Sequence, residues 1–171
     1  GRRLYVAMAT DNRIAVIDLD AGRVVGSIPT AWYPVAVAIS PDGERAYVNA
    51  EVDATITAID AESGKRLWRS EPQPVVVLTL AAAEGRVCYS DRKEIVCLDL
   101  ATGKPRWKFT AGGRIDSPPT IHLGRALVGC RDGCVYSLRA DDGEVAWRFH
   151  GPGVGERIAA NGQIESVAPI H

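Results

Sequence analysis

The sequence lacks what would attract it to nucleic acid or hold it in a membrane. Its 20 basic and 21 acidic side chains give a net charge of −1, so no overall field draws the chain to a polyanion. The longest apolar run, residues 75–83, is interrupted by Thr79, and a membrane-spanning helix needs about 20 apolar residues. We therefore expect no nucleic-acid partner and no membrane span.

A targeting signal and helical periodicity are also missing. The first residues, Gly1 to Arg3, lead directly into a strand-like segment without the apolar core of a secretory signal peptide. A mature or truncated product could still be exported. No stretch has the 3.6-residue spacing of an amphipathic helix. With 171 residues, of which 46% are hydrophobic and 24% charged, the chain has the length and composition of one globular domain.

The four cysteines leave several alternatives open. Cys130 and Cys134 would face each other across a tight hairpin, and Cys88 and Cys97 would lie on neighbouring strands. Their spacings are not those of the usual zinc knuckles, so we expect no metal site there. Buried or free thiols are favoured because cysteine is among the most buried residue types, and a disulfide is the alternative.

An internal repeat is the main signal in the sequence. Four segments share a glycine at positions 22, 64, 103 and 143, so the spacings are 42, 39 and 40 residues. Three copies have a tryptophan four residues after this glycine, and the first copy has Gly26 there. Three copies have an aspartate four residues before it, and the fourth has Arg139. A regular period near 40 residues indicates a repeat architecture.

Each period divides into short strands separated by turns. In the second copy the expected strands are residues 35–40, 45–49, 56–60 and 66–69, with a turn signal at 41–43. Four strands in about 40 residues are typical of a propeller blade, which buries its faces against neighbouring blades. The sequence therefore predicts an all-β fold, a partial β-propeller of four-stranded antiparallel blades.

The blade boundaries follow from the repeat. We expect a partial blade over residues 1–30, blades over 31–70, 71–110 and 111–150, and a long loop with the start of the next blade over 151–171. Closed propellers typically have 4–8 blades. This favours a fragment of a longer propeller, whose missing blades come from the same or another chain. A self-assembling partial propeller is the alternative.

The repeat resembles a known family. Residues 58–68, AIDAESGKRLW, are similar to the tryptophan-docking pattern A-x-D-x-x-x-G-K-x-x-W of pyrroloquinoline-quinone (PQQ)-type propellers. The third copy matches from Asp99 to Trp107, with Cys97 in place of the alanine. Residues 33–48 are similar to YVTN-type propeller repeats. Together the resemblance covers nearly the whole chain.

The resemblance implies structural roles for the repeated residues. In the family the tryptophan packs between blades, where a buried indole brings about 150–250 Å² of contact area, and the aspartate and glycine shape a turn. We therefore interpret the repeated residues as a structural blade motif and not as a stacking platform for a base or quinone. They are Asp18, Gly22, Asp60, Gly64, Trp68, Asp99, Gly103, Trp107, Gly143 and Trp147.

Candidate binding residues lie in the loops between blades, which line one mouth of a propeller channel. These loops are residues 30–34, 71–74, 111–116 and 150–165, and the last is the longest and is rich in glycine. Two of them lead into a similar polar pattern of an acid, a serine and a histidine. The residues are Asp116, Ser117 and His122 in one copy and Glu165, Ser166 and His171 in the next, preceded by Arg114 and Gln163.

Two interpretations of this pattern remain open. The polar residues could form a channel-facing cluster that binds an anion, a metal or a small polar ligand. Alternatively, the acids accept backbone hydrogen bonds at the starts of strands, which the sequence favours. We predict no catalytic residue.

The family resemblance gives two functional hypotheses. The first is a non-catalytic module for ligand or protein binding or scaffolding in an exported bacterial protein, periplasmic or extracellular, with a protein partner or small polar ligand and without a cofactor. The second is a fragment of a quinoprotein alcohol or sugar dehydrogenase that uses PQQ and calcium. Several members of that class have an adjacent Cys-Cys pair, which this sequence lacks. The first hypothesis is favoured, although fold alone does not imply function.

Overall fold

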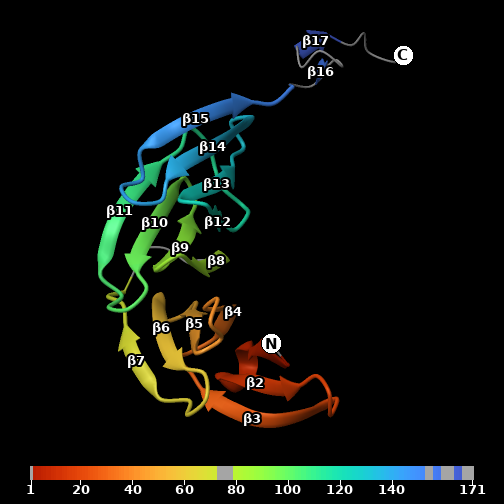
Figure 1. The fold of residues 1–171 in the computed structure, drawn as a ribbon, viewed down its shortest axis with the longest axis vertical. Coiled ribbons are helices and arrows are strands. Elements are labelled where there is room, and N and C mark those ends of the chain that lie inside the picture. Colours follow the sequence, from red (N-terminus) through yellow and green to blue (C-terminus); the bar gives the residue numbers. More distant parts are fainter. Residues whose placement is uncertain (1, 73–78, 153–155, 159–163, 167–171) are drawn as a thin grey trace.

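The chain folds almost entirely into short antiparallel strands. The computed structural model describes residues 2–72, 79–152, 156–158 and 164–166. Successive small sheets follow one another along an arc from the N-terminus to β15 (Figure 1). One short 3₁₀ turn, η1 (Ala9–Asp11), interrupts the strands. The predicted all-β propeller fold of antiparallel blades is therefore confirmed.

Four sheets correspond to four consecutive repeats, and we number them as blades. Blade 1 contains β1 (Arg3–Met8), β2 (Arg13–Asp18) and β3 (Arg23–Pro29). Blade 2 contains β4 (Pro34–Ile39), β5 (Arg45–Ala50), β6 (Thr55–Asp60) and β7 (Arg66–Arg69). Blade 3 contains β8 (Thr79–Ala83), β9 (Arg86–Asp91), β10 (Glu94–Asp99) and β11 (Pro105–Thr110). Blade 4 contains β12 (Thr120–His122), β13 (Arg125–Gly129), β14 (Cys134–Arg139) and β15 (Val145–His150).

The last sheet differs from the expected long loop. Strands β16 (Glu156–Ile158) and β17 (Ile164–Ser166) pair with each other as a two-stranded antiparallel sheet. In Figure 1 this sheet lies beyond the end of β15, outside the arc of blades. Part of the segment expected to run as a loop from residue 150 to 165 thus forms its own hairpin.

A β-bulge recurs at the same place in each of the four blades. The extra residue stands in the outermost strand, and it is Val25, Leu67, Arg106 and Ala146 in the four blades. The residue that follows it holds the repeat position that carries Gly26 in blade 1 and a tryptophan in the other blades. Because a bulge increases local twist and re-aims side chains, this irregularity contributes to the orientation of the indoles.

The turn before the outermost strand is closed by the repeated aspartate and glycine. The Asp60 carboxylate accepts hydrogen bonds from the Ser63 amide and hydroxyl, both at 2.7 Å. The Gly64 amide donates to the Asp60 carbonyl at 2.9 Å, and Gly64 has φ +71°, which glycine adopts without strain. In blade 4, where Arg139 replaces the aspartate, an ion pair of 2.5 Å between Arg139 and Asp142 braces the turn instead.

Apolar side chains between successive blades form the core. The first cluster joins Ile14, Val16 and Ile28 of blade 1 to Val48 and Ile59 of blade 2. A second cluster lies between blades 2 and 3, and a third between blades 3 and 4. Each blade is therefore covered on the faces that meet a neighbour, and stability comes from nearest-neighbour packing.

Two of the repeated tryptophans lie across these seams. The Trp68 ring covers Gly103 of the next blade so closely that a Cβ there would lie 2.5 Å from Cε3, and the Trp68 Nε1–H donates to the Leu100 carbonyl at 3.2 Å. The Trp107 ring covers Gly143 in the same way, and its Nε1–H donates to the Ala140 carbonyl at 2.8 Å. At these two seams an indole on one blade therefore packs directly on a glycine of the next.

Trp147 departs from the predicted interblade packing. Its side chain is 49% exposed, whereas Trp107 is only 8% exposed. The physical reason is that no described blade follows blade 4, so the face of β15 that carries Trp147 has no neighbour among the described residues (Figure 1).

The cysteines divide into a disulfide and two thiols. Cys88 and Cys97 are directly opposite each other on β9 and β10 and form a disulfide. Cys130 and Cys134 are free thiols, although they flank the tight turn that the sequence predicted. The sequence favoured buried or free thiols and left a disulfide as the alternative. That alternative holds for Cys88 and Cys97, since their strands pair in the register that aligns them.

The described residues contain no helix that is long and apolar enough to cross a membrane.

The indole–glycine seam gives a direct stability prediction. Gly143→Ala should destabilise the fold by about 2–4 kcal/mol, because it adds overpacking against the Trp107 ring to the strain of a side chain at φ +77°. Gly124→Ala is the matched control, since Gly124 has φ +69° and open space around its Cβ position. This variant should cost only about 1 kcal/mol. Urea unfolding measures both, and equal losses would contradict the account.

Candidate functional site

The loops between blades lie at one edge of the arc, together with the turns between the second and third strands of blades 2, 3 and 4. We call this edge the interblade rim, and it comprises residues 30–33, 51–54, 92–93, 111–119 and 130–133. Backbone hydrogen bonds join each loop to a neighbouring turn. The Glu51 amide donates to the Tyr33 carbonyl at 2.9 Å, and the Arg131 amide donates to the Arg114 carbonyl at 2.8 Å. These hydrogen bonds fix the interblade loops against the turns of the neighbouring blades.

A carboxylate between two arginines occupies the rim at blade 4. The Arg114 Nε lies 2.5 Å from Asp116 Oδ1, and Arg131 forms an ion pair with Asp116 Oδ2. Both arginine side chains are more than half exposed, and the aspartate is partly covered. The cluster therefore has one positive charge in excess and remains accessible to solvent.

The arginines determine the ionisation of this cluster. Burial raises the pKa of Asp116, but the hydrogen bond from Arg131 and the charges of Arg114 and Arg131 together hold that pKa below its ordinary value. Asp116 is therefore ionised at neutral pH. Arg131 was not among the candidate residues from the sequence, because nothing in its local pattern showed that its turn would lie against the loop that carries Asp116.

Hydrogen bonds to the Asp132 carboxylate stabilise the turn that carries Arg131. The Asp132 carboxylate accepts the Cys134 amide at 3.0 Å and a short hydrogen bond from the Tyr136 hydroxyl. This hydrogen bond is the main cause of the raised pKa of Tyr136. Burial raises the pKa of the nearby Cys130 thiol. A Cβ at Gly113 would lie 2.7 Å from the Asp132 backbone nitrogen, so the glycine permits loop and turn to meet.

The other sequence-predicted residues of this copy do not join the arginine cluster. His122 is exposed at the far end of β12, beside the Leu123–Gly124 turn, whereas Asp116 and Ser117 come before that strand. Ser117 is exposed, and its carbonyl accepts the Ser90 hydroxyl at 3.5 Å. The structure therefore brings together Arg114 and Asp116 but places His122 at the opposite edge.

The second predicted copy has a different placement. Glu165 and Ser166 lie within β17, opposite Arg157 and Glu156 of β16. Asp116 and Ser117 precede their strand, so the two copies do not occupy equivalent backbone positions as the sequence spacing suggested. Gln163 and His171 lie outside the described residues.

The rim also carries an exposed apolar patch at blades 1 and 2, which sequence reasoning missed. Trp32, Tyr33 and Val52 form this aromatic patch, and their exposed fractions are 63%, 41% and 60%. The Trp32 amide donates to the Asp53 carboxylate at 2.8 Å, and the Tyr33 amide donates to the Asn12 side chain at 2.9 Å. Tyr33 has φ +61°. Strain of this kind persists only where the surroundings hold it.

One buried carboxylate lies at the rim end of β9. Burial raises the pKa of Asp91, and the charge of Glu94 raises it further. Its Oδ1 has no hydrogen-bond partner among the described residues. The described part of the chain has no group of three or more His, Cys, Asp or Glu residues that could hold a metal ion. The rim thus presents exposed aromatic and cationic groups.

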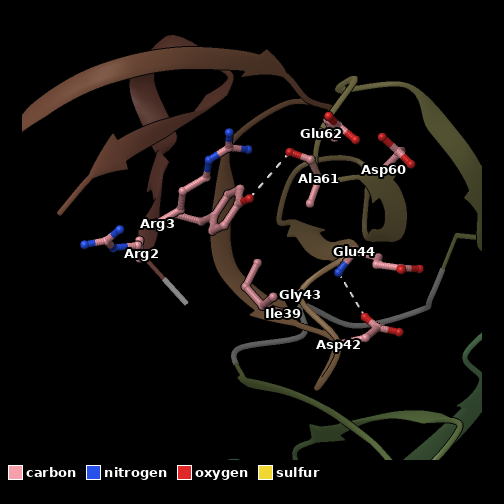
Figure 2. A pocket seen from close by; sticks show the side chains of 10 residues that line it. Arg2, Arg3, Ile39, Asp42, Gly43, Glu44, Asp60, Ala61 and Glu62 are labelled. Atoms are coloured by element: carbon pink, nitrogen blue, oxygen red, sulfur yellow. Dashed lines mark hydrogen bonds between the residues drawn. The ribbon is translucent and has the colours of Figure 1, made fainter. Parts of the chain in front are cut away.

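A hollow of about 600 Å³ lies at the other edge of the arc (Figure 2). It is bordered by Arg2 and Arg3 from the start of blade 1 and by turns of blade 2. The Tyr5 hydroxyl donates to the Ala61 carbonyl at 3.4 Å across it. Two of its acids have hydrogen-bond partners: the Asp42 carboxylate accepts the Glu44 amide at 2.9 Å, and the Asp60 carboxylate accepts the Ser63 amide at 2.7 Å.

The arginine cluster predicts a measurable pKa change. Arg131→Ala should move the pKa of Asp116 upward toward the ordinary value of about 3.9, because one cation and its hydrogen bond are removed. Because the pKa is lowered in the folded state, ionised Asp116 stabilises the fold at pH values above its ordinary pKa. This stabilisation is lost as the pH falls through the folded-state pKa. NMR titration of the Asp116 carboxyl carbon provides the measurement. Arg125→Ala, at the opposite edge, is the control, and an unchanged pKa in Arg131→Ala would refute the ion-pair assignment.

The sequence is similar to that of several known proteins. The family model described as "Outer membrane protein assembly factor BamB", a PQQ-type repeat model, matches residues 52–167. The chain is 30% identical over 119 residues to the BamB of Burkholderia pseudomallei, covering 70% of this chain and 30% of that protein. It is also 29% identical over 119 residues to the quinohemoprotein alcohol dehydrogenase ADH IIB of Pseudomonas putida, covering 56% of this chain and 17% of that protein.

The fold has solved relatives. The crystal structure of BamB from Moraxella catarrhalis superposes with a TM-score of 0.77 at 17% identity, covering 90% of this chain and 47% of that chain. The chain spans less than a third of the length of the curated relatives it matches. Since the family model matches more than half of the chain, this protein belongs to the PQQ-type repeat family of the outer membrane protein assembly factor BamB.

Proposed function

We propose that this chain is part of a non-catalytic scaffold of the BamB type, which binds a protein partner in outer membrane protein assembly. The aromatic patch of Trp32, Tyr33 and Val52 carries the proposal. Tryptophan and tyrosine are enriched among the residues that dominate the binding energy of protein interfaces. A loop whose amides donate to the Asp53 and Asn12 side chains presents them with a lower cost of ordering the backbone on binding.

The charge distribution supports a partner of defined chemistry. Arg114 and Arg131 lie on the same rim as the aromatic patch and share one carboxylate, Asp116. A partner segment that presents an apolar side chain to the patch and an acidic side chain to the arginines would match both features. Rim charges of this kind steer association and fix orientation more than they add affinity. The same arginines could also hold a small anionic ligand.

A periplasmic location is part of the proposal. The relatives named BamB act in outer membrane protein assembly by their names. The Cys88–Cys97 disulfide supports an oxidising compartment, because disulfides form and persist in the bacterial periplasm and are rare in the cytosol.

The quinoprotein dehydrogenase hypothesis has weaker support. Likeness to the alcohol dehydrogenase of Pseudomonas putida favours it. However, the described residues do not gather the acidic or other metal-binding side chains that a calcium-bound quinone would need, so we derive no reaction step through that cofactor. Titration with PQQ and calcium distinguishes the two hypotheses: the scaffold predicts no change in quinone absorbance.

Site-specific crosslinking tests the scaffold function. A photoreactive benzoylphenylalanine replacing Trp32, in the chain exported to the periplasm of a Gram-negative host, should form an adduct with a subunit of the outer membrane protein assembly machinery. The same probe replacing Leu123 is the control, because Leu123 is 80% exposed at the opposite edge. Tyr33→Ala should lower the Trp32 adduct yield by about tenfold, as expected for loss of an aromatic hot spot. Equal adducts at both positions, or none at Trp32, would contradict the proposal.

A further inference from the structure

Two free cysteines flank the turn of the arginine cluster. The Cys130 amide donates to the Cys134 carbonyl at 2.9 Å, and the Gly133 amide donates to the Cys130 carbonyl at 3.2 Å. The two cysteines are therefore opposite each other across the connection formed by residues 131–133. Residues that oppose each other in an antiparallel hairpin have their side chains on the same face of the sheet.

The backbone of this pair suits a disulfide. Opposed residues joined by backbone hydrogen bonds across antiparallel strands have Cα atoms about 5.5 Å apart, and disulfides usually join Cα atoms about 4.4–6.8 Å apart. Gly133 has φ +82°, so the chain reverses there without strain. Closure of a disulfide between Cys130 and Cys134 therefore requires rotation of two side chains and no rearrangement of the hairpin.

Both thiols also approach the same carboxylate. Burial raises the pKa of Asp132, but hydrogen bonds from the Tyr136 hydroxyl and from the thiols of Cys130 and Cys134 hold that pKa below its ordinary value. The Cys134 sulfur lies 4.0 Å from the Asp132 carbonyl oxygen. The two sulfur atoms are thus gathered on one side of the turn, around one residue.

The two cysteine pairs of the chain differ in their access to solvent. Cys134 belongs to the apolar cluster between blades 3 and 4, and Cys130 packs against this cluster. Cys134 is 6% exposed, whereas Cys130 is only partly buried. A reagent in solution can therefore reach the Cys130 sulfur, with the Cys134 sulfur behind it. Cys88 and Cys97 are both completely buried.

We propose that Cys130 and Cys134 are a redox modification site, which closes to a disulfide and reopens by exchange with a small-molecule thiol–disulfide couple. The Cys130 thiolate attacks one sulfur of the oxidised reagent and releases the first thiolate. The Cys134 thiol then loses its proton, attacks the Cys130 sulfur of the mixed disulfide and releases the second thiolate. One S–S bond replaces two S–H bonds, and the two protons and two electrons convert the reagent's disulfide into two thiols.

Closure of this disulfide acts on the arginine cluster. Arg131 lies inside the ring that the bond completes, and its partner is Asp116 on the adjoining loop. Exposed disulfides are the reducible ones, whereas buried structural disulfides resist reduction by glutathione. The site can therefore respond to redox conditions while the Cys88–Cys97 disulfide stays closed. The proposal does not rest on the proposed function, since the exchange is measured on the chain alone.

Disulfide mapping after incubation of the whole chain in glutathione buffers tests the proposal. Trypsin cleaves after Arg131, so the new disulfide links peptide 126–131 to peptide 132–139, whereas the buried one links 87–92 to 94–106. We expect the first link in oxidised glutathione and its complete loss in excess reduced glutathione, with the second link present in both. The buffer is mildly alkaline, because burial raises the pKa of Cys130 and the thiolate is the nucleophile. Alkylation before digestion prevents later exchange.

Cys130→Ser is the matched control, because it keeps a side chain of similar size without a sulfur. In this variant Cys134 should link to no other peptide, and the link between 87–92 and 94–106 should persist. A glutathione adduct on Cys130 without the link to Cys134 overturns the proposal, as do two alkylated thiols in oxidised glutathione. Equal loss of both links in reduced glutathione also overturns it. If Cys130→Ser fails to fold, the two links of the unchanged chain still decide the matter.

Discussion

The indole that covers a glycine on the next blade is the contact on which the rest of this structure depends. A single blade of four short strands cannot bury both of its faces. The Trp107 ring closes the seam to blade 4 because Gly143, at the left-handed position of its turn, has no side chain that would collide with the ring. The same turn presents the Ala140 carbonyl to the indole N–H at 2.8 Å. Apolar packing and a satisfied polar group thus coincide at one place.

This constraint explains which parts of the architecture could be predicted from sequence. The glycines near every fortieth residue, and the tryptophans after them, specify local turns and repeat spacing, so the all-β blades could be inferred. The bulge beside each indole was not predicted, because the motif does not show in which register the two strands pair. The exposure of Trp147 could not be inferred from the motif alone, because it depends on whether a neighbouring blade covers β15.

The candidate site was less accessible to sequence reasoning. Arg114 and Asp116 are close in the chain, and their pairing agrees with that spacing. Arg131 reaches the same carboxylate only because two glycines let the loop approach the turn of the next hairpin. The exposure of Trp32 likewise depends on its loop being held against Asp53 of a distant turn. Nonlocal contacts of this kind leave no periodic pattern in the sequence and could not be predicted, whereas the repeat of about 40 residues could.

A double-mutant cycle on one seam tests the central claim most directly. Urea unfolding of Trp107→Ala, Gly143→Ala and the combined variant gives the coupling free energy between the Trp107 indole and Gly143. If the ring is what excludes a side chain at residue 143, the cost of Gly143→Ala should fall to about 1 kcal/mol once the indole is absent, leaving only the backbone strain. Additive losses, within about 0.5 kcal/mol, would show that the indole and glycine act independently and would contradict the account.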